Sequence, residues 1–118
     1  MRLFNKPGFT IIEIMIVIAI IAIALAIAIP NYLHMTLTAK RTICIDNMKK
    51  ITAEVSQWAI DNNITAGTAV TSEQENDMYS NYFRSGRPVC PLGGQYSISP
   101  IGENPQVRCS KEDQGHKL

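Results

Sequence analysis

The sequence lacks the close residue pairs and loops on which most small catalytic and metal-binding domains depend. Its three cysteines include no C-x-x-C pair. Gly93-Gly94 is not followed by the Lys-Ser/Thr of a phosphate-binding P-loop. The two histidines, His34 and His116, have no nearby Ser–Asp or Cys partner pattern. These absences argue against an enzyme, and we expect no catalytic residues, no bound cofactor and no metal site.

The chain also lacks an excess of charge of either sign. It has 11 Lys and Arg residues against 10 Asp and Glu residues, and its formal net charge is +1. A nucleic-acid groove normally carries clustered positive charge, so we expect no nucleic-acid partner. The balance is also unlike that of an acidic tail or of a disordered chain.

The dominant feature that is present is one long apolar run, Phe9–Ile29 (FTIIEIMIVIAIIAIALAIAI), which we call the apolar segment. As a helix it is about 31 Å long, enough to cross a bilayer core of about 30 Å. Its apolar side chains occupy every face of such a helix, which is not the pattern of an amphipathic helix on a soluble core. The sequence therefore predicts a membrane-spanning helix after a short basic leader, residues 1–8.

Glu13 is the one charged residue inside the apolar segment. A carboxylate in a membrane segment costs at least a few kcal/mol, so it is usually functional. A positive charge would offset this cost, and cleavage after Gly8 would create one, the free amine of Phe9. That amine lies one helical turn from Glu13 in the same chain, and the amine of a neighbouring copy would serve equally and link subunits. The alternative is a neutral carboxyl, or one that snorkels to the membrane surface.

The stretch Gly8-Phe9-Thr10-Ile11-Ile12-Glu13, with its apolar run ending at Ile29-Pro30, resembles the prepilin signal of type IV pilins and type II secretion pseudopilins. This resemblance implies that the membrane enzyme prepilin peptidase cleaves between Gly8 and Phe9 and methylates the new amine of Phe9. It also implies that Glu13 meets the Phe9 amine of a neighbouring subunit during filament assembly. Pro7 and Ala22 stand where many relatives have a polar residue and a glycine.

The cut would come before the apolar segment, unlike that of an ordinary secretory signal, so the anchor would be retained. Arg2 and Lys6 precede the segment, and no further Lys or Arg occurs until Lys40. The positive-inside rule then places the N-terminus in the cytoplasm of a bacterial inner-membrane protein. The rest of the chain faces the periplasm or the exterior, where disulfides can form.

After the membrane segment the pattern predicts that one helix continues to about Asp61. Pro30 removes a helical N–H group, so we expect a kink or local break there. Beyond Pro30 the apolar residues recur at intervals of three, four or seven, as on one face of a helix. From Phe9 to Asp61 such a helix would be about 80 Å long. The predicted contact stripe consists of Leu33, Leu37, Cys44, Met48, Ile51, Val55 and Trp58.

The remaining residues predict a small domain of one short helix and two or three strands. Thr71 with Gln74 and Ser72 with Glu75 are alternative capping boxes for a helix that ends near Phe83. Residues 95–99 and 106–110 are the predicted strands. The expected fold is α+β: a leader at 1–8, a transmembrane assembly helix at 9–30, an amphipathic helix at 31–62 and a small globular domain at 63–118.

The C-terminal residues also resemble a group of small prepilin-like proteins, through Cys90-Pro91-Leu92-Gly93-Gly94-Gln95-Tyr96, Cys109-Ser110 and Gly115-His116. We expect a Cys90–Cys109 disulfide, which would bracket the hairpin and stabilise it by about 3 kcal/mol. Cys44 would then be a buried free thiol. The competing pairings join Cys44 to Cys90 or to Cys109. Zinc binding by Cys90, Cys109 and His116 is disfavoured because no close ligand pair is present.

Three functions remain. The first is a structural subunit of a type IV pilus-like or type II secretion pseudopilus filament, with copies of itself, other pilin-like subunits, prepilin peptidase and an inner-membrane assembly platform as partners. The second is a single-pass membrane protein that displays a small periplasmic binding domain. The third is a periplasmic redox or metal-binding domain built on the three cysteines, which the absence of C-x-x-C disfavours. We expect the first. Calcium binding by loop carboxylates is left open because the sequence shows no ligand spacing for it.

Overall fold

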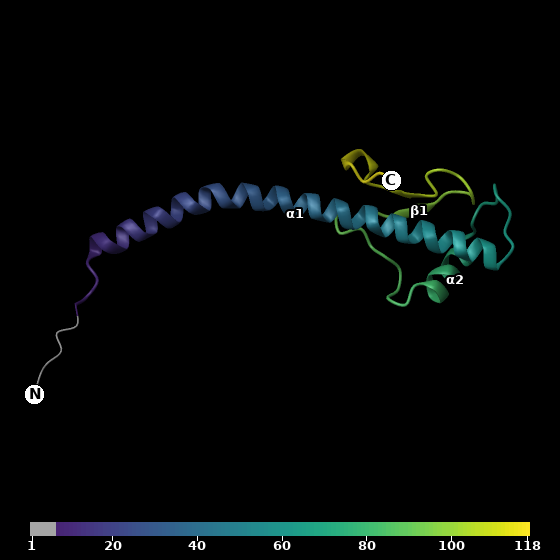
Figure 1. Cartoon of the computed structure of the whole chain (residues 1–118), viewed down its shortest axis with the longest axis horizontal. Helices are drawn as coiled ribbons and strands as arrows, with labels where there is room; N and C mark the ends of the chain where they lie inside the picture. The colour runs from purple at the N-terminus through teal and green to yellow at the C-terminus, as the bar shows by residue number, and fades with distance from the viewer. Residues whose placement is uncertain (1–6) are drawn as a thin grey trace, which may run out of the picture. The chain divides into compact units, whose positions relative to one another are not determined.

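The computed structural model describes residues 7–118, so the leader residues Arg2 and Lys6 lie outside the described part (Figure 1). The chain divides into two compact units, which end and begin at Thr36 and Leu37. We call them the N-terminal unit and the C-terminal unit. Helix α1, Ile11–Asp61, contributes to both. It confirms the predicted long helix and its end at Asp61.

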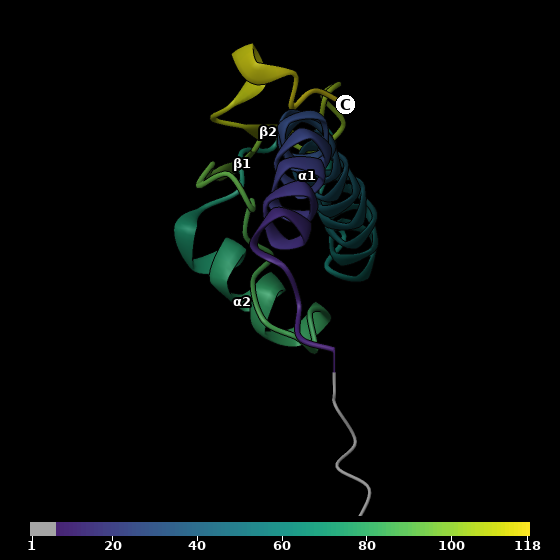
Figure 2. The same ribbon diagram turned by 90° about the vertical axis from the view of Figure 1, so that its left-hand side faces the viewer.

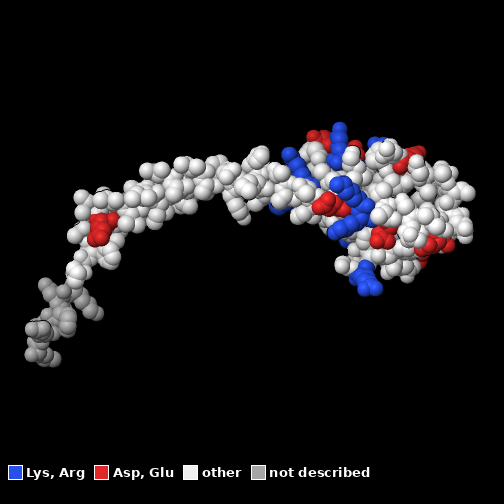
Figure 3. All heavy atoms as spheres, viewed as in Figure 1, with Lys and Arg blue, Asp and Glu red and all other residues white. Residues whose placement is uncertain are grey.

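In the N-terminal unit, α1 is apolar on every face and exposed. Large hydrophobic side chains from Ile11 to Ile29 are exposed throughout, since no other part of this unit covers them. Within the described residues, α1 is the one helix long and apolar enough to cross a membrane. Figure 3 shows this surface as uncharged except for one acidic site near its start, where the sequence has Glu13.

Pro30 lies inside α1, and the helix continues on both sides of it. Proline lacks an N–H group and removes one intrahelical hydrogen bond, but the neighbouring turns remain helical. The predicted local break is therefore not seen. The kink assigned to Pro30 stays a prediction.

In the C-terminal unit, α1 buries one face. Cys44, Met48 and Ile51 are fully buried, and Val55 and Trp58 are nearly so, because their spacing places them on one side of the helix. This confirms most of the predicted stripe. Leu33 and Leu37 are exposed, so the buried stripe begins later than predicted.

Helix α2, Ser72–Tyr82, begins with a capping box. Thr71 is the N-cap: its hydroxyl accepts a hydrogen bond from the Gln74 backbone N–H, and the Gln74 side chain accepts one from the Thr71 N–H. Of the two predicted boxes, the structure therefore uses Thr71 and Gln74. Met78 and Tyr79 of α2 pack in the core.

The two strands, β1 (Tyr96–Ile98) and β2 (Val107–Cys109), pair antiparallel, with Tyr96 opposite Cys109. A 3-10 turn, η1 (Glu112–Gln114), follows β2. Viewed along the helix in Figure 2, α2 and both strands lie to one side of α1. This arrangement closes the core over the buried face of α1. The α+β layout of a long helix, a short helix and a small sheet is confirmed.

Candidate functional site

The predicted processing site lies just before α1. Gly8 and Phe9 are exposed, and Phe9 retains 79% of its accessible surface. A Cβ atom added to Gly8 would meet nothing within 4 Å. The fold of the chain itself therefore places no demand on glycine at this position.

Glu13 lies in the first turn of α1 and is exposed. The Thr10 hydroxyl accepts a hydrogen bond of 3.3 Å from the Glu13 backbone N–H, which begins the helix as an N-cap does. A carboxylate in a first turn is favoured by the helix dipole. Between residues 7 and 39 the chain contains no Lys or Arg. No Lys or Arg within this stretch can therefore pair with Glu13.

A second site contains Cys90, Cys109 and His116, the three residues for which the sequence analysis disfavoured zinc binding, together with Cys44. Four side chains meet in the core of the C-terminal unit, and we call them the Cys–His cluster: Cys44, Cys90, Cys109 and His116. They come from α1, the loop before β1, the end of β2 and the tail after η1. Their four ligand atoms all lie within 4.8 Å of one another. The imidazole Nδ1 is 3.5 Å from Cys90 Sγ and 3.8 Å from Cys109 Sγ.

All four members of the cluster are buried. Cys44 and His116 are 0% exposed, Cys90 is 2% exposed and Cys109 is 3% exposed. His116 is therefore not a solvated tail residue. Its Nε2 atom is buried without a hydrogen-bond partner among residues 7–118.

The loop after Cys90 brings backbone N–H groups to its sulfur. Burial would raise the pKa of the Cys90 thiol, but hydrogen bonds from the backbone of Leu92 and Gly94 and from the neighbouring thiols lower it overall. Gly94 is required for this close approach, because a Cβ there would lie 2.5 Å from Cys109 Sγ and 3.2 Å from Cys90 Sγ.

Cys44 shows the opposite behaviour. Burial, with a smaller lowering from its hydrogen bond to Tyr96, raises the pKa of the Cys44 thiol to about 12. Burial and the same bond also raise the pKa of Tyr96. The Tyr96 hydroxyl accepts a further hydrogen bond of 3.3 Å from the Asn47 side chain.

All three cysteines are free thiols in the structure. The Cys90–Cys109 disulfide and its competitors therefore stay predictions, and the structure places all three sulfurs near enough for any pairing to compete. Among residues 7–118 the Cys–His cluster is the one group of three or more His, Cys, Asp or Glu side chains close enough to share an ion. Among the same residues, the loop carboxylates considered for calcium form no group of three or more that could share an ion.

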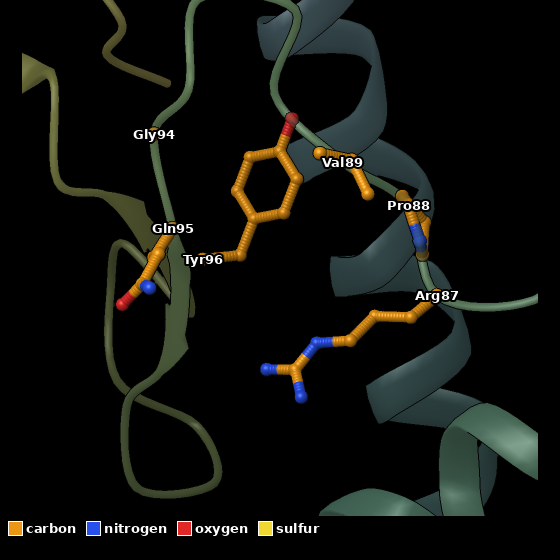
Figure 4. Close-up of a pocket in the computed structure, with 6 residues that line it drawn as sticks. All are labelled: Arg87, Pro88, Val89, Gly94, Gln95 and Tyr96. Carbon is orange, nitrogen blue, oxygen red and sulfur yellow. The ribbon is translucent and has the colours of Figure 1, made fainter.

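A surface pocket of about 310 Å³ lies beside β1, lined by Arg87, Pro88, Val89, Gly94, Gln95 and Tyr96. Figure 4 shows the Tyr96 ring between its strand and the loop of residues 87–89, with Arg87 reaching across below it. The Arg87 guanidinium lies 4.6 Å from the centre of the Tyr79 ring and also pairs with Glu75. The positive charge of Arg87 is thus paired with groups of the C-terminal unit itself. The lining offers no nucleophile paired with a base.

The sequence analysis disfavoured zinc binding by Cys90, Cys109 and His116 because the chain has no close ligand pair, and it did not add Cys44 as the fourth member. Cys44 is far from the other three in sequence, and only the return of the C-terminal tail to α1 brings His116 beside it. One signal was available: Cys44 lies on the apolar stripe of the helix, which predicts a buried thiol facing the small domain.

Comparison with family models gave one match. Residues 3–29 match the model of the prokaryotic N-terminal methylation motif. The curated proteins and the solved structures gave no match. The matched residues contain Gly8, Phe9, Glu13 and the whole apolar segment. The chain therefore carries, at its N-terminus, the class III signal of type IV pilin-like prepilins.

Proposed function

We propose that the protein is a structural subunit of a type IV pilus-like or type II secretion pseudopilus filament, held in the inner membrane before assembly. The observation that carries this proposal is the coincidence of the methylation motif with an exposed apolar helix interrupted by one acid. A simple anchor needs the helix but neither the cleavage signal nor Glu13.

The exposed apolar surface of α1 in the N-terminal unit supplies the driving force for filament assembly. Its isoleucines are covered by no part of their own unit. Lipid covers such a surface in the membrane. Once a subunit leaves the membrane, other copies must cover it, and burying each large aliphatic side chain contributes about 1.5–3 kcal/mol. Cohesion of the filament then comes from helices packed side by side.

Glu13 sets the register of that packing. Apolar side chains alone would allow neighbouring helices to slide, since one isoleucine contact resembles the next. A carboxylate that pairs with the methylated Phe9 amine of an adjacent subunit permits one relative position. Fixing a register is the best-attested role of a buried polar group. The C-terminal unit is the water-soluble part of each subunit.

The proposal places the N-terminus of the precursor in the cytoplasm and the C-terminal unit in the periplasm. Prepilin peptidase cleaves between Gly8 and Phe9 and methylates Phe9. An inner-membrane assembly platform then stacks the mature subunits with copies of themselves or with other pilin-like subunits. The single-pass membrane protein with a small binding domain is the competing function, and it requires no cleavage.

The test is the intact mass of the protein expressed with and without prepilin peptidase. With the peptidase we expect loss of residues 1–8 and gain of one methyl group. The Gly8→Val variant should remain full length, because a Cβ atom at position 8 meets nothing within 4 Å in the chain's own fold and the substitution should act on recognition by the peptidase. Asn5→Ala, which leaves Gly8-Phe9 intact, is the control and should be cleaved. A full-length wild-type product in the presence of active peptidase would favour the competing function.

A further inference from the structure

We propose that the Cys–His cluster is a structural zinc site in which three thiolates and the Nδ1 atom of His116 bind one Zn²⁺ ion. The site would join α1 to the loop, strand and tail that pack on it. This inference is independent of the filament function, because every ligand belongs to the C-terminal unit.

The distances from the His116 Nδ1 atom to two of the sulfurs match those of a tetrahedral zinc site. Zn–S bonds of about 2.3 Å and a Zn–N bond of about 2.0 Å put two sulfurs about 3.8 Å apart, and a sulfur and a nitrogen about 3.6 Å apart. The Nδ1 atom lies 3.5 Å from one sulfur and 3.8 Å from another. The limit of 4.8 Å on all pairs of ligand atoms leaves room for one ion at the centre and for little else.

Burial favours a metal over free thiols. A thiol is a weak hydrogen-bond donor, so three thiols recover little of the cost of burying the imidazole of His116. The Nε2 atom has no partner among the described residues, so the interaction at Nδ1 must account for the burial of this ring. Coordination to Zn²⁺ uses the Nδ1 lone pair and leaves the proton on Nε2.

Burial also disfavours a disulfide as the sole explanation. A disulfide between any two of the cysteines would leave the third thiol and the imidazole buried beside it with little to bind. All four side chains are at most 3% exposed. A zinc ion uses every member of the cluster.

The backbone around Cys90 is arranged as a ligand loop. The N–H groups of Leu92 and Gly94 both point to its sulfur, as donors to a thiolate would. Gly93 has a positive φ of 77°, which turns the chain, and Gly94 lets the loop pass close to the sulfur of Cys109. A side chain at position 94 would occupy the place of the cluster.

The donor set selects the ion and its role. Three sulfurs and one nitrogen in a tetrahedron are a usual set for structural zinc, and harder ions such as Mg²⁺ and Ca²⁺ prefer oxygen. Four protein ligands fill the coordination shell and leave no position for water or substrate. On binding, the three thiol protons are released to solvent, and the centre carries a net charge of −1. Lys111, whose side chain lies beside Gly94, is a nearby cation.

The test uses the full chain in detergent, purified under reducing conditions and loaded with Zn²⁺ alone. Metal analysis should give one zinc per chain. X-ray absorption on the wild-type protein should show three sulfurs at about 2.3 Å and one nitrogen at about 2.0 Å. This measurement needs no variant and is therefore unaffected by variants that fail to fold.

Variants then assign the ligands. Cys44→Ser and His116→Gln should each lower zinc affinity at least tenfold. When Co²⁺ replaces zinc, the absorption band of thiolate bound to Co²⁺ should be weaker for Cys44→Ser but not for His116→Gln. His34→Gln, at the other histidine, is the matched control and should bind zinc as the wild type does. Reduced wild-type protein that binds no zinc, or binds it without sulfur ligands, would overturn the proposal. Zinc bound equally well by His116→Gln would overturn the assignment of the fourth ligand.

Discussion

Glu13→Gln is expected to leave the precursor in the membrane and to reduce its entry into filaments roughly a hundredfold or more. The neutral amide is cheaper to hold in lipid than a carboxylate, so insertion should not suffer. In the filament, however, the substitution leaves the Phe9 amine of the neighbouring subunit without its countercharge. Breaking one half of a buried ion pair costs about 3–5 kcal/mol, which is the basis of the expected factor.

The measurement compares the amount of each variant in the membrane fraction with the amount in sheared or pelleted filaments. Two matched variants separate the assembly role of Glu13 from its place in the first turn of α1. Glu13→Asp keeps the charge and should retain part of the assembly. Thr10→Val removes the hydroxyl that accepts the Glu13 N–H but keeps the carboxylate, so it should assemble nearly normally. If Glu13→Gln entered filaments at the wild-type level, the carboxylate would have no role in register.

Met48→Ala is expected to lower the free energy of unfolding of the C-terminal unit by about 2–5 kcal/mol. Met48 is fully buried on α1, and its loss removes apolar contacts and leaves a cavity in a small core. Folded domains have a total stability of only about 5–15 kcal/mol. One substitution at this position should therefore remove a large part of the free energy of unfolding of the C-terminal unit.

Trp58 provides the readout, since it is the chain's one tryptophan and lies 3% exposed in the same core. Denaturant titration of the full chain in detergent, followed by its fluorescence, should show an earlier midpoint for Met48→Ala. Lys49→Ala, at the next and exposed position, should leave the midpoint nearly unchanged. Equal midpoints for the two variants would mean that the face of α1 carrying Met48 is not the core of this unit.

The sequence predicted most of the fold because its local signals agree with its tertiary packing. The spacing from Cys44 to Trp58 gives the buried face of α1 directly. Leu33 and Leu37 continue the same spacing but are exposed, since periodicity cannot tell where a partner element stops covering a helix. The two capping boxes of α2 were equally good in sequence. Only the backbone geometry at Thr71 separates them.

The two sites differ in how much of each could be predicted from the sequence. The processing and assembly residues, from Gly8 to Glu13, form one continuous motif, so they can be read without a structure. The Cys–His cluster depends on the tail folding back so that His116 meets Cys44 on α1, and no spacing along the chain contains that information. The criterion of a close ligand pair therefore disfavoured Cys90, Cys109 and His116, although the fold brings them together with Cys44.

The most direct test of the filament account is the intact mass of the protein found in filaments of its own cell. We predict that the filament fraction contains a chain beginning at Phe9 and carrying one methyl group at that residue. A chain that still begins at Met1, found in the membrane and absent from every polymer, would contradict the account.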